Sequence, residues 1–126
     1  MHKLIHIVLF DIDGTLIDSD GAGRKALNRA FAKAYAWEDA LRGLSLQGQT
    51  DPSILNSVFL ERRETPPTKA ETDRLYGLYL LELRHTLRDA NSFRLLPGVG
   101  RLLARLSGRE NTIIGLATGN IEKGAR

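Results

Sequence analysis

Two short apolar runs, each followed at once by polar residues, stand out along the chain. Residues 4–10 are almost continuously apolar and lead into Asp11, and residues 112–117 lead into Thr118. Runs of this length without polar alternation are typical of strands that are buried on both faces of a parallel sheet. We therefore predict two buried parallel strands, joined by a right-handed crossover that includes a helix.

Between the two runs, apolar residues recur at helical spacing. The first predicted helix covers about residues 21–35, and its apolar face consists of Leu27, Ala30, Phe31, Ala34 and Tyr35. A second helix should begin near Asp51, with Asp51 as the N-cap and Pro52 at the first helical position. The two prolines that follow Thr65 end this helix.

Two further helices precede the second strand. Thr68, followed three residues later by Glu71, has the pattern of a capping box, so a third helix starts there and should end around Asn91. A short fourth helix is predicted over residues 99–106. The chain stops at Arg126, within the start of another predicted helix.

The order of these elements predicts an α/β protein. Residues 1–20 and 92–126 would form part of a parallel sheet with its helices. Residues 21–91 would form an inserted, all-helical subdomain, long enough to be a small bundle of its own. No internal repeat interrupts this division.

Composition excludes several classes of protein. The chain has no cysteine, which excludes disulfides and thiolate metal sites and fits the cytoplasm, where we expect the protein to work. The run at residues 4–10 is too short to span a bilayer, and the acidic residues after it are unlike a secretion signal. The formal net charge is +3 with scattered basic residues, so we expect neither a nucleic-acid nor a membrane partner. The oligomeric state is left open.

The strongest chemical signal follows the first apolar run and reads Asp11-Ile12-Asp13-Gly14-Thr15-Leu16-Ile17-Asp18-Ser19. Residues two apart in an extended chain point the same way, so Asp11 and Asp13 could both face the ligand-binding edge of the sheet. Two carboxylates this close repel each other, and a Mg²⁺ ion, which prefers oxygen ligands, would remove that repulsion. An aspartate can also attack phosphorus and form an acyl-phosphate.

This string resembles the first motif of the haloacid dehalogenase superfamily, and residues 16–19 resemble its phosphoglycolate phosphatase-like branch, which has a helical cap. The resemblance implies a Rossmann-like parallel sheet core with residues 21–91 as the cap subdomain. It implies that Asp11 is the nucleophile and a magnesium ligand. It further implies that Asp13 binds at the metal site and acts as general acid and then base, while Ile12 lends a backbone carbonyl to the metal.

Thr118, Gly119 and Asn120, after the second run, resemble the second motif of the same family. The resemblance implies that these residues bind the substrate, with the Thr118 hydroxyl donating to the transferring phosphoryl group. Backbone N–H groups near the start of the next helix would complete an anion site. By themselves the three residues describe only a turn, and it is their pairing with the first motif that favours function.

Other positions carry weaker signals. Residues 48–51 resemble a cap loop that some relatives use for substrate contact, with a simple N-cap role for Asp51 as an equal alternative. Arg24 and Lys25 could face an anionic substrate, although a solvated helix surface is favoured. We interpret three aromatic residues as cap core and not as a stacking platform: Trp37, Tyr76 and Tyr79.

Two further motifs of the family, a lysine and an acidic group that completes the magnesium site, have no assigned place in these 126 residues. Lys123 lies too close to Thr118 to be assigned as that lysine. We therefore expect the sequence to be the front portion of a longer enzyme. Two core strands alone would expose apolar strand edges, so the isolated chain should be poorly stable and catalytically weak or inactive.

The predicted function is magnesium-dependent hydrolysis of a small phosphorylated metabolite through an aspartyl-phosphate on Asp11. A phosphosugar mutase would use the same residues with a sugar as the phosphoryl acceptor. A 2-haloacid dehalogenase and a phosphonate hydrolase are disfavoured, because those enzymes usually lack the second aspartate, here Asp13. A non-catalytic fragment that acts as a binding or regulatory module stays open as an alternative of a different class.

Overall fold

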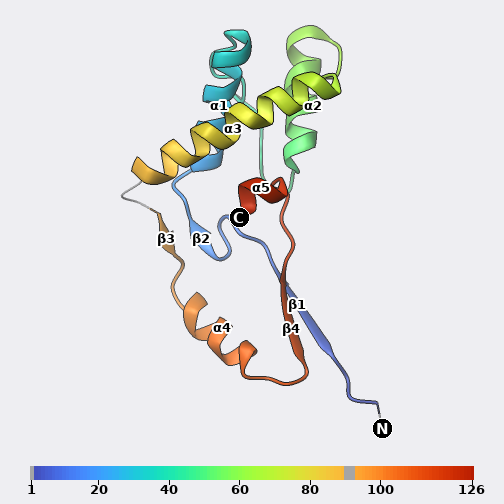
Figure 1. Ribbon diagram of the computed structural model, residues 1–126, viewed down its shortest axis with the longest axis vertical. Helices are drawn as coiled ribbons and strands as arrows, with labels where there is room; N and C mark the ends of the chain where they lie inside the picture. The colour runs from blue at the N-terminus through green and yellow to red at the C-terminus, as the bar shows by residue number, and fades with distance from the viewer. Residues whose placement is uncertain (1, 90–92) are drawn as a thin grey trace. The chain divides into compact units, whose positions relative to one another are not determined.

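A computed structural model describes residues 2–89 and 93–126 (Figure 1). The chain divides by its internal contacts into two units. The described part of the first, the sheet unit, is residues 2–20 and 93–118. The described part of the second, the helical unit, is residues 21–89 and 119–126. Residues 119–126 thus group with the helices, whereas the sequence placed them with the sheet.

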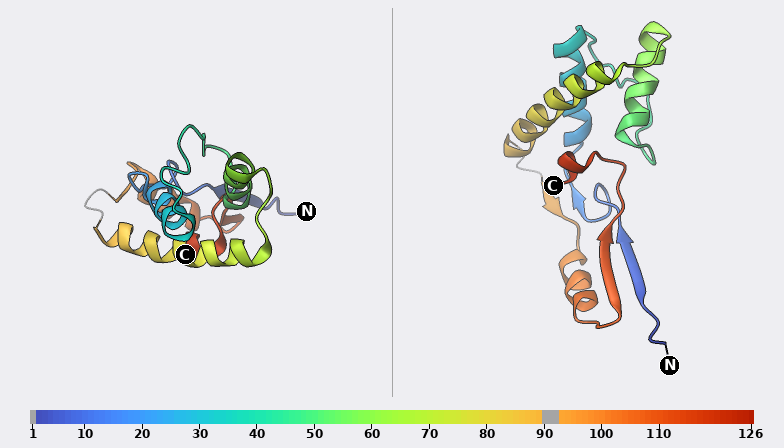
Figure 2. Two further views of the ribbon diagram at one scale, coloured as in Figure 1. Left: turned by 90° about the horizontal axis from the view of Figure 1, so that it is seen from above. Right: turned by 45° about the vertical axis from the view of Figure 1, so that its right-hand side comes forward.

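The sheet unit is built on one parallel strand pair. Strand β1 (His6–Phe10) lies beside β4 (Thr112–Leu116), with His6 opposite Thr112 and Phe10 opposite Leu116 (Figures 1 and 2). Helix α4 (Val99–Ser107) precedes β4 and contacts it. The two predicted strands, their parallel pairing and the helix before the second strand are therefore confirmed.

The burial expected of these strands is wrong for the described residues. Ile7 is 66% exposed, Leu9 is 60% exposed and Ile113 is 55% exposed. A sheet of two strands that has one helix in contact with β4 leaves much of its apolar surface in water. The apolar runs predicted a larger sheet, covered on both faces, than these residues form. The observed exposure agrees with the separate expectation that two core strands alone would leave apolar surface uncovered.

A second, very short ribbon was not predicted. Strand β2 (Ile17–Asp18) pairs antiparallel with β3 (Arg94–Leu95), and a guanidinium nitrogen of Arg94 lies 3.1 Å from Asp18 Oδ2. Strands of two residues have no periodicity to detect, so only the spatial approach of the two segments identifies them.

The helical unit contains α1 (Ala22–Tyr35), α2 (Asp51–Arg63), α3 (Lys69–Asp89) and the four-residue α5 (Glu122–Ala125). The predicted capping box is confirmed, since Thr68 N–H donates to Glu71 Oε2 at 2.8 Å and Glu71 N–H donates to Thr68 Oγ1 at 3.3 Å. Arg63 joins the end of α2 to this box with two hydrogen bonds of 2.7 Å to the Glu71 carboxylate. The predicted end of the third helix, at Asn91, lies outside the described residues.

The cap of α2 differs from the prediction by one residue. Thr50 is the N-cap and accepts the N–H of Ser53 on its hydroxyl oxygen at 3.3 Å. Asp51 is the first helical residue and Pro52 the second. Threonine and aspartate both cap helices well, so the sequence alone did not separate two adjacent candidates.

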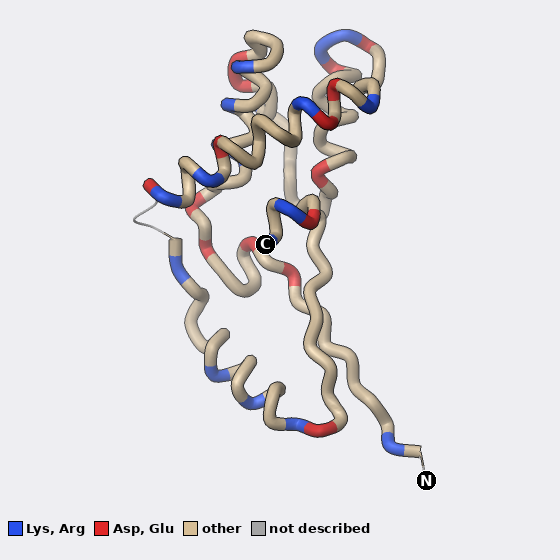
Figure 3. The backbone as a smooth tube through the Cα atoms, viewed as in Figure 1, with Lys and Arg blue, Asp and Glu red and all other residues tan. Residues whose placement is uncertain are grey.

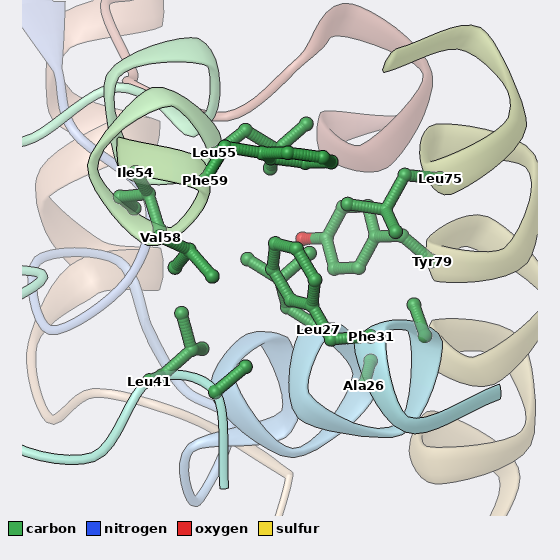
Figure 4. Packing of buried hydrophobic residues seen from close by; sticks show 12 residues of the cluster. Ala26, Leu27, Phe31, Leu41, Ile54, Leu55, Val58, Phe59, Leu75 and Tyr79 are labelled. Carbon is green, nitrogen blue, oxygen red and sulfur yellow. The ribbon is translucent and has the colours of Figure 1, made fainter. Parts of the chain in front are cut away.

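The core of the helical unit lies where α1, α2 and α3 meet (Figure 4). The largest fully buried side chains are Phe31, Phe59, Leu41, Leu55, Leu75 and Val58. Trp37 stacks on Tyr35 with ring centres 4.7 Å apart, and Phe59 meets the Trp37 ring edge-on at 5.3 Å. Tyr79 therefore belongs to the core, as predicted, and Trp37 and Tyr76 are partly buried and pack against it.

The distribution of charge along the described chain agrees with a solvated surface. Lys and Arg positions are interspersed with Asp and Glu along the helices and do not form a continuous stripe (Figure 3). No helix in the described ranges is both long enough and apolar enough to cross a membrane.

Candidate active site

Asp11 and Thr118 come from neighbouring strands of the sheet unit. Phe10 is the last residue of β1 and pairs with Leu116, the last residue of β4. The pairing continues one step further, because Ala117 N–H donates to the carbonyl oxygen of Phe10 at 2.8 Å. Adjacent strands lie about 4.8 Å apart, so the backbone of Asp11 and that of Thr118 leave the sheet at the same edge, one position out of register.

The turn after Asp11 is closed by its own backbone. The carbonyl oxygen of Ile12 accepts the N–H groups of Thr15, Leu16 and Ile17 at 3.2, 2.9 and 3.2 Å. Gly14 has a φ of +76°, in the left-handed region that glycine enters without steric cost, and its N–H donates to Ile17 at 2.8 Å. The predicted turn at Gly14 is confirmed.

The turn also uses one expected metal ligand, the carbonyl oxygen of Ile12. This oxygen already accepts three N–H groups, although a carbonyl oxygen has only two lone pairs. In this conformation a cation would compete with those hydrogen bonds. The metal-binding role that the family resemblance implied for the Ile12 carbonyl therefore stays a prediction.

The two aspartates are both exposed. The hydroxyl of Ser19 donates to Asp13 Oδ1 at 3.4 Å, and the backbone of Asp13 forms an isolated bridge with Ile17. Because β1 ends at Phe10, the alternation of an extended strand does not extend through Asp13. The prediction that Asp11 and Asp13 share one pocket thus stays a prediction.

Magnesium fits this turn only in part. Exposed carboxylates are suitable ligands, and Mg²⁺ is commonly held by one or two of them together with phosphate oxygens and water. Across residues 2–89 and 93–126, no group of three or more histidine or acidic side chains is placed to hold a metal ion. Asp11 and Asp13 could contribute carboxylate ligands but would not form a complete protein cage.

Residues 119–121, which follow Thr118 and belong to the helical unit, are hydrogen-bonded to Asp51 of the same unit. The carbonyl of Gly119 accepts the N–H of Asp51 at 2.8 Å, and the N–H of Ile121 donates to Asp51 Oδ2, also at 2.8 Å. The following helix, α5, has four residues and carries Glu122 in its first turn. The N–H groups at the start of α5, which were predicted to complete an anion site, therefore lie in the same turn as a carboxylate, and that charge disfavours an anion there.

Two weaker sequence signals are changed by the structure. Residues 48–51, considered for substrate contact, lie against Gly119, where a Cβ would come 2.4 Å from the carbonyl oxygen of Gln49. Arg24 is partly buried, and its guanidinium donates to the carbonyl oxygens of Leu41 and Leu44. Arg24 therefore binds a loop of its own unit and is only partly exposed to solvent in this conformation.

A cavity of about 490 Å³ lies within the helical unit, lined by Asp73, Tyr76, Gly77, Leu80, Ile121, Glu122 and Lys123. None of the predicted catalytic or substrate-binding residues lines it. The Tyr76 hydroxyl is buried and has no hydrogen-bond partner among the described residues. Burial, with a smaller contribution from the negative charge of Asp51, raises the pKa of Tyr76 to about 12.

No family model matches this chain, and no curated protein matches it. Solved structures do. CbbY from Rhodobacter sphaeroides in complex with phosphate superposes with a TM-score of 0.68 over 96% of this chain and 54% of its own, at 21% identity. The chain has the haloacid dehalogenase fold.

Other structures with the haloacid dehalogenase fold agree. A predicted phosphoglycolate phosphatase from Haemophilus somnus 129pt gives a TM-score of 0.61 over 98% of this chain and 55% of its own, at 20% identity. A β-phosphoglucomutase candidate from Bacteroides vulgatus gives 0.65 over 91% and 45%, at 21% identity. The chain spans about half the length of these haloacid dehalogenase-fold structures. The α/β class and the Rossmann-like parallel pairing predicted from the sequence are confirmed at the level of the fold.

Proposed function

We propose that this chain carries the nucleophile of a magnesium-dependent phosphomonoester hydrolase, and that Asp11 is the residue that becomes phosphorylated. The pairing of Phe10 with Leu116 is the observation that supports this most directly, because it brings Asp11 and Thr118 to one edge of the sheet unit. A nucleophile and a donor to the phosphoryl oxygens have to act on the same phosphorus atom, so they need this proximity.

The fold supports the class of substrate. The CbbY structures that share it contain phosphate in one case and xylulose-(1,5)-bisphosphate, bound to an Asp-to-Asn mutant, in another. Those ligands belong to CbbY. They favour a small phosphorylated metabolite here as well, in agreement with what the two aspartates and Thr118 suggest.

The proposed reaction has two steps. In the first, a carboxylate oxygen of Asp11 attacks phosphorus in line with the leaving group. The bond between phosphorus and the ester oxygen breaks, and protonated Asp13 gives its proton to the leaving alkoxide. The Thr118 hydroxyl donates to a phosphoryl oxygen, which stabilises the negative charge on the transferring group.

In the second step, water attacks the phosphorus of the aspartyl-phosphate. The Asp13 carboxylate takes a proton from that water, the bond from phosphorus to Asp11 breaks, and inorganic phosphate leaves. Mg²⁺ held by carboxylates of this turn, phosphate oxygens and water would offset the negative charges that meet at this point. A mutase would differ only in using a sugar hydroxyl in place of this water.

The test measures hydrolysis of an aryl phosphate with Mg²⁺ and with a chelator, on this chain and on any longer gene product that contains it. We expect Asp11→Asn to abolish hydrolysis and phosphorylation of the protein as detected by intact mass. Asp20→Asn, an exposed carboxylate a few residues on, is the matched control and should retain activity. Full activity in Asp11→Asn would remove the proposed nucleophile, whereas phosphate binding without hydrolysis in every form would favour a binding module.

A further inference from the structure

Asp51 and the loop after Thr118 hold each other by two reciprocal hydrogen bonds. The backbone N–H of Asp51 donates to Gly119, and the side chain of Asp51 accepts from Ile121, both at 2.8 Å. Both contacts lie within the helical unit. One residue at the start of α2 therefore fixes both ends of a three-residue segment.

Burial makes this pairing costly to lose. Asp51 is only 7% exposed, and a buried carboxylate is strongly destabilising unless hydrogen bonds compensate for its lost hydration. The other buried carboxylate of the described chain, that of Glu82, pairs with the ammonium group of Lys33. At Asp51 the backbone N–H of Ile121 supplies a hydrogen bond to the charge, which ties the carboxylate to that segment.

Helix capping does not account for the Asp51 side chain. The hydroxyl of Thr50 accepts the N–H of Ser53 and so performs the capping role at α2. The Asp51 carboxylate accepts instead from Ile121, a residue 70 positions further along the chain. The side chain thus makes a long-range contact.

The same contact requires glycine at position 119. A Cβ at Gly119 would come 2.4 Å from the carbonyl oxygen of Gln49 and 3.1 Å from Cα of Thr50. Backbone atoms at these distances have no room to yield, so a larger residue would force the two segments apart. The close approach therefore depends on Asp51 from one side and on Gly119 from the other.

We propose that Asp51 is a positioning residue, which holds the backbone of residues 119–121 in one conformation directly after Thr118. The proposal rests on the function proposed above, in which Thr118, the residue directly before this segment, donates to the phosphoryl group. A loop that is ordered before phosphate binds loses less conformational entropy on binding, so its affinity for the anion is higher. Asp51 would raise phosphate affinity through the loop without itself touching phosphate.

The test uses the full chain and compares its variants with the unaltered protein in two measurements. The first is amide hydrogen exchange at Ile121 by NMR, and the second is the affinity for inorganic phosphate in the presence of Mg²⁺. Asp51→Ala should speed exchange at Ile121 about tenfold or more, because a charge-assisted hydrogen bond is lost. It should weaken phosphate binding about threefold or more. Asp51→Asn keeps a side-chain carbonyl oxygen and should retain most of both, while Gly119→Ala should cause the same losses as Asp51→Ala.

Thr50→Ala is the matched control, since it removes the cap of α2 and leaves the Asp51 contact in place. It should lower thermal stability without changing exchange at Ile121 relative to neighbouring amides, or phosphate affinity. Unchanged Ile121 exchange in Asp51→Ala, or equal effects of Thr50→Ala, would overturn the proposal. If neither the unaltered chain nor any longer gene product that contains it binds phosphate, the proposed function fails, and the exchange comparison still decides whether Asp51 holds the loop.

Discussion

Phe59 offers the sharpest test of the helical unit, because its ring lies at the centre of an aromatic cluster. The side chain is fully buried. Its ring centre is 6.0 Å from that of Phe31 and 5.3 Å from those of Tyr35 and Trp37. The guanidinium carbon of Arg63 lies 4.6 Å from the same centre. Phe59→Ala removes all of these contacts at once.

The expected cost is large compared with the stability available. Truncating a buried phenylalanine to alanine typically costs about 3–5 kcal/mol. Each aromatic pair adds about 0.5–1.5 kcal/mol beyond burial, which places Phe59→Ala in the upper part of that range. A unit of this size has a total free energy of unfolding of about 4–12 kcal/mol. The substitution should therefore remove a large fraction of it.

Urea denaturation followed by Trp37 fluorescence measures this loss, since Trp37 is the single tryptophan and contacts Phe59 directly. Phe59→Leu keeps much of the volume and should cost less than Phe59→Ala, so it remains measurable if Phe59→Ala unfolds. The neighbouring Leu60, which is 43% exposed, provides the control: Leu60→Ala should cost about 0.5 kcal/mol or less. A loss below about 1 kcal/mol for Phe59→Ala, or an equal loss for Leu60→Ala, would refute the packing described for α2.

Three further outcomes are expected. Hydrogen bonds from Arg63 lower the pKa of Glu71 from 4.5 to about 2. The ionised Glu71 carboxylate therefore contributes its full stabilisation above about pH 4.5, and this stabilisation is lost as the pH falls toward 2. The urea midpoint of Glu71→Gln should not show this dependence on pH. Tyr76→Phe removes a buried hydroxyl that has no hydrogen-bond partner among the described residues, so the melting temperature measured by calorimetry should stay unchanged or rise. A clear decrease would show that the hydroxyl does form a hydrogen bond. Gly14→Ala meets no neighbouring atom within 4 Å, so backbone strain alone should cost the sheet unit about 1–2 kcal/mol, seen as faster amide exchange in β1.

Local signals in the sequence predicted the local structure well. The capping box of Thr68 and Glu71, the turn at Gly14 and the two parallel strands all follow from residue chemistry or spacing within a few positions. The one-residue error at Thr50 and Asp51 has the same local character, because both residue types can cap a helix.

What the sequence could not supply depends on contacts between distant segments. Nothing near Asp51 shows that its carboxylate binds Ile121, and nothing near Ile17 shows that it pairs with Leu95. The exposure of Ile7 is likewise set by how many elements cover the sheet and not by the apolar run itself. For the candidate site, the adjacency of Asp11 and Thr118 was predictable, because each directly follows an apolar run and the two runs form parallel strands. The hydrogen bonds that the Ile12 carbonyl accepts within its own turn were not predictable.

The pairing of β1 with β4 has a consequence for how the chain folds during synthesis. Phe10 meets Leu116, which is made 106 residues later, so at about 5–20 residues per second β1 waits roughly 5–20 s for its partner. The helices between them are made before β4, and their mutual contacts span shorter stretches of sequence, such as the 49 positions from Lys33 to Glu82, so they can form in the meantime. In pulse-labelled hydrogen exchange on refolding, amides of α1 and α3 should therefore gain protection before those of β1, so that the apolar strand is the last of these elements to form.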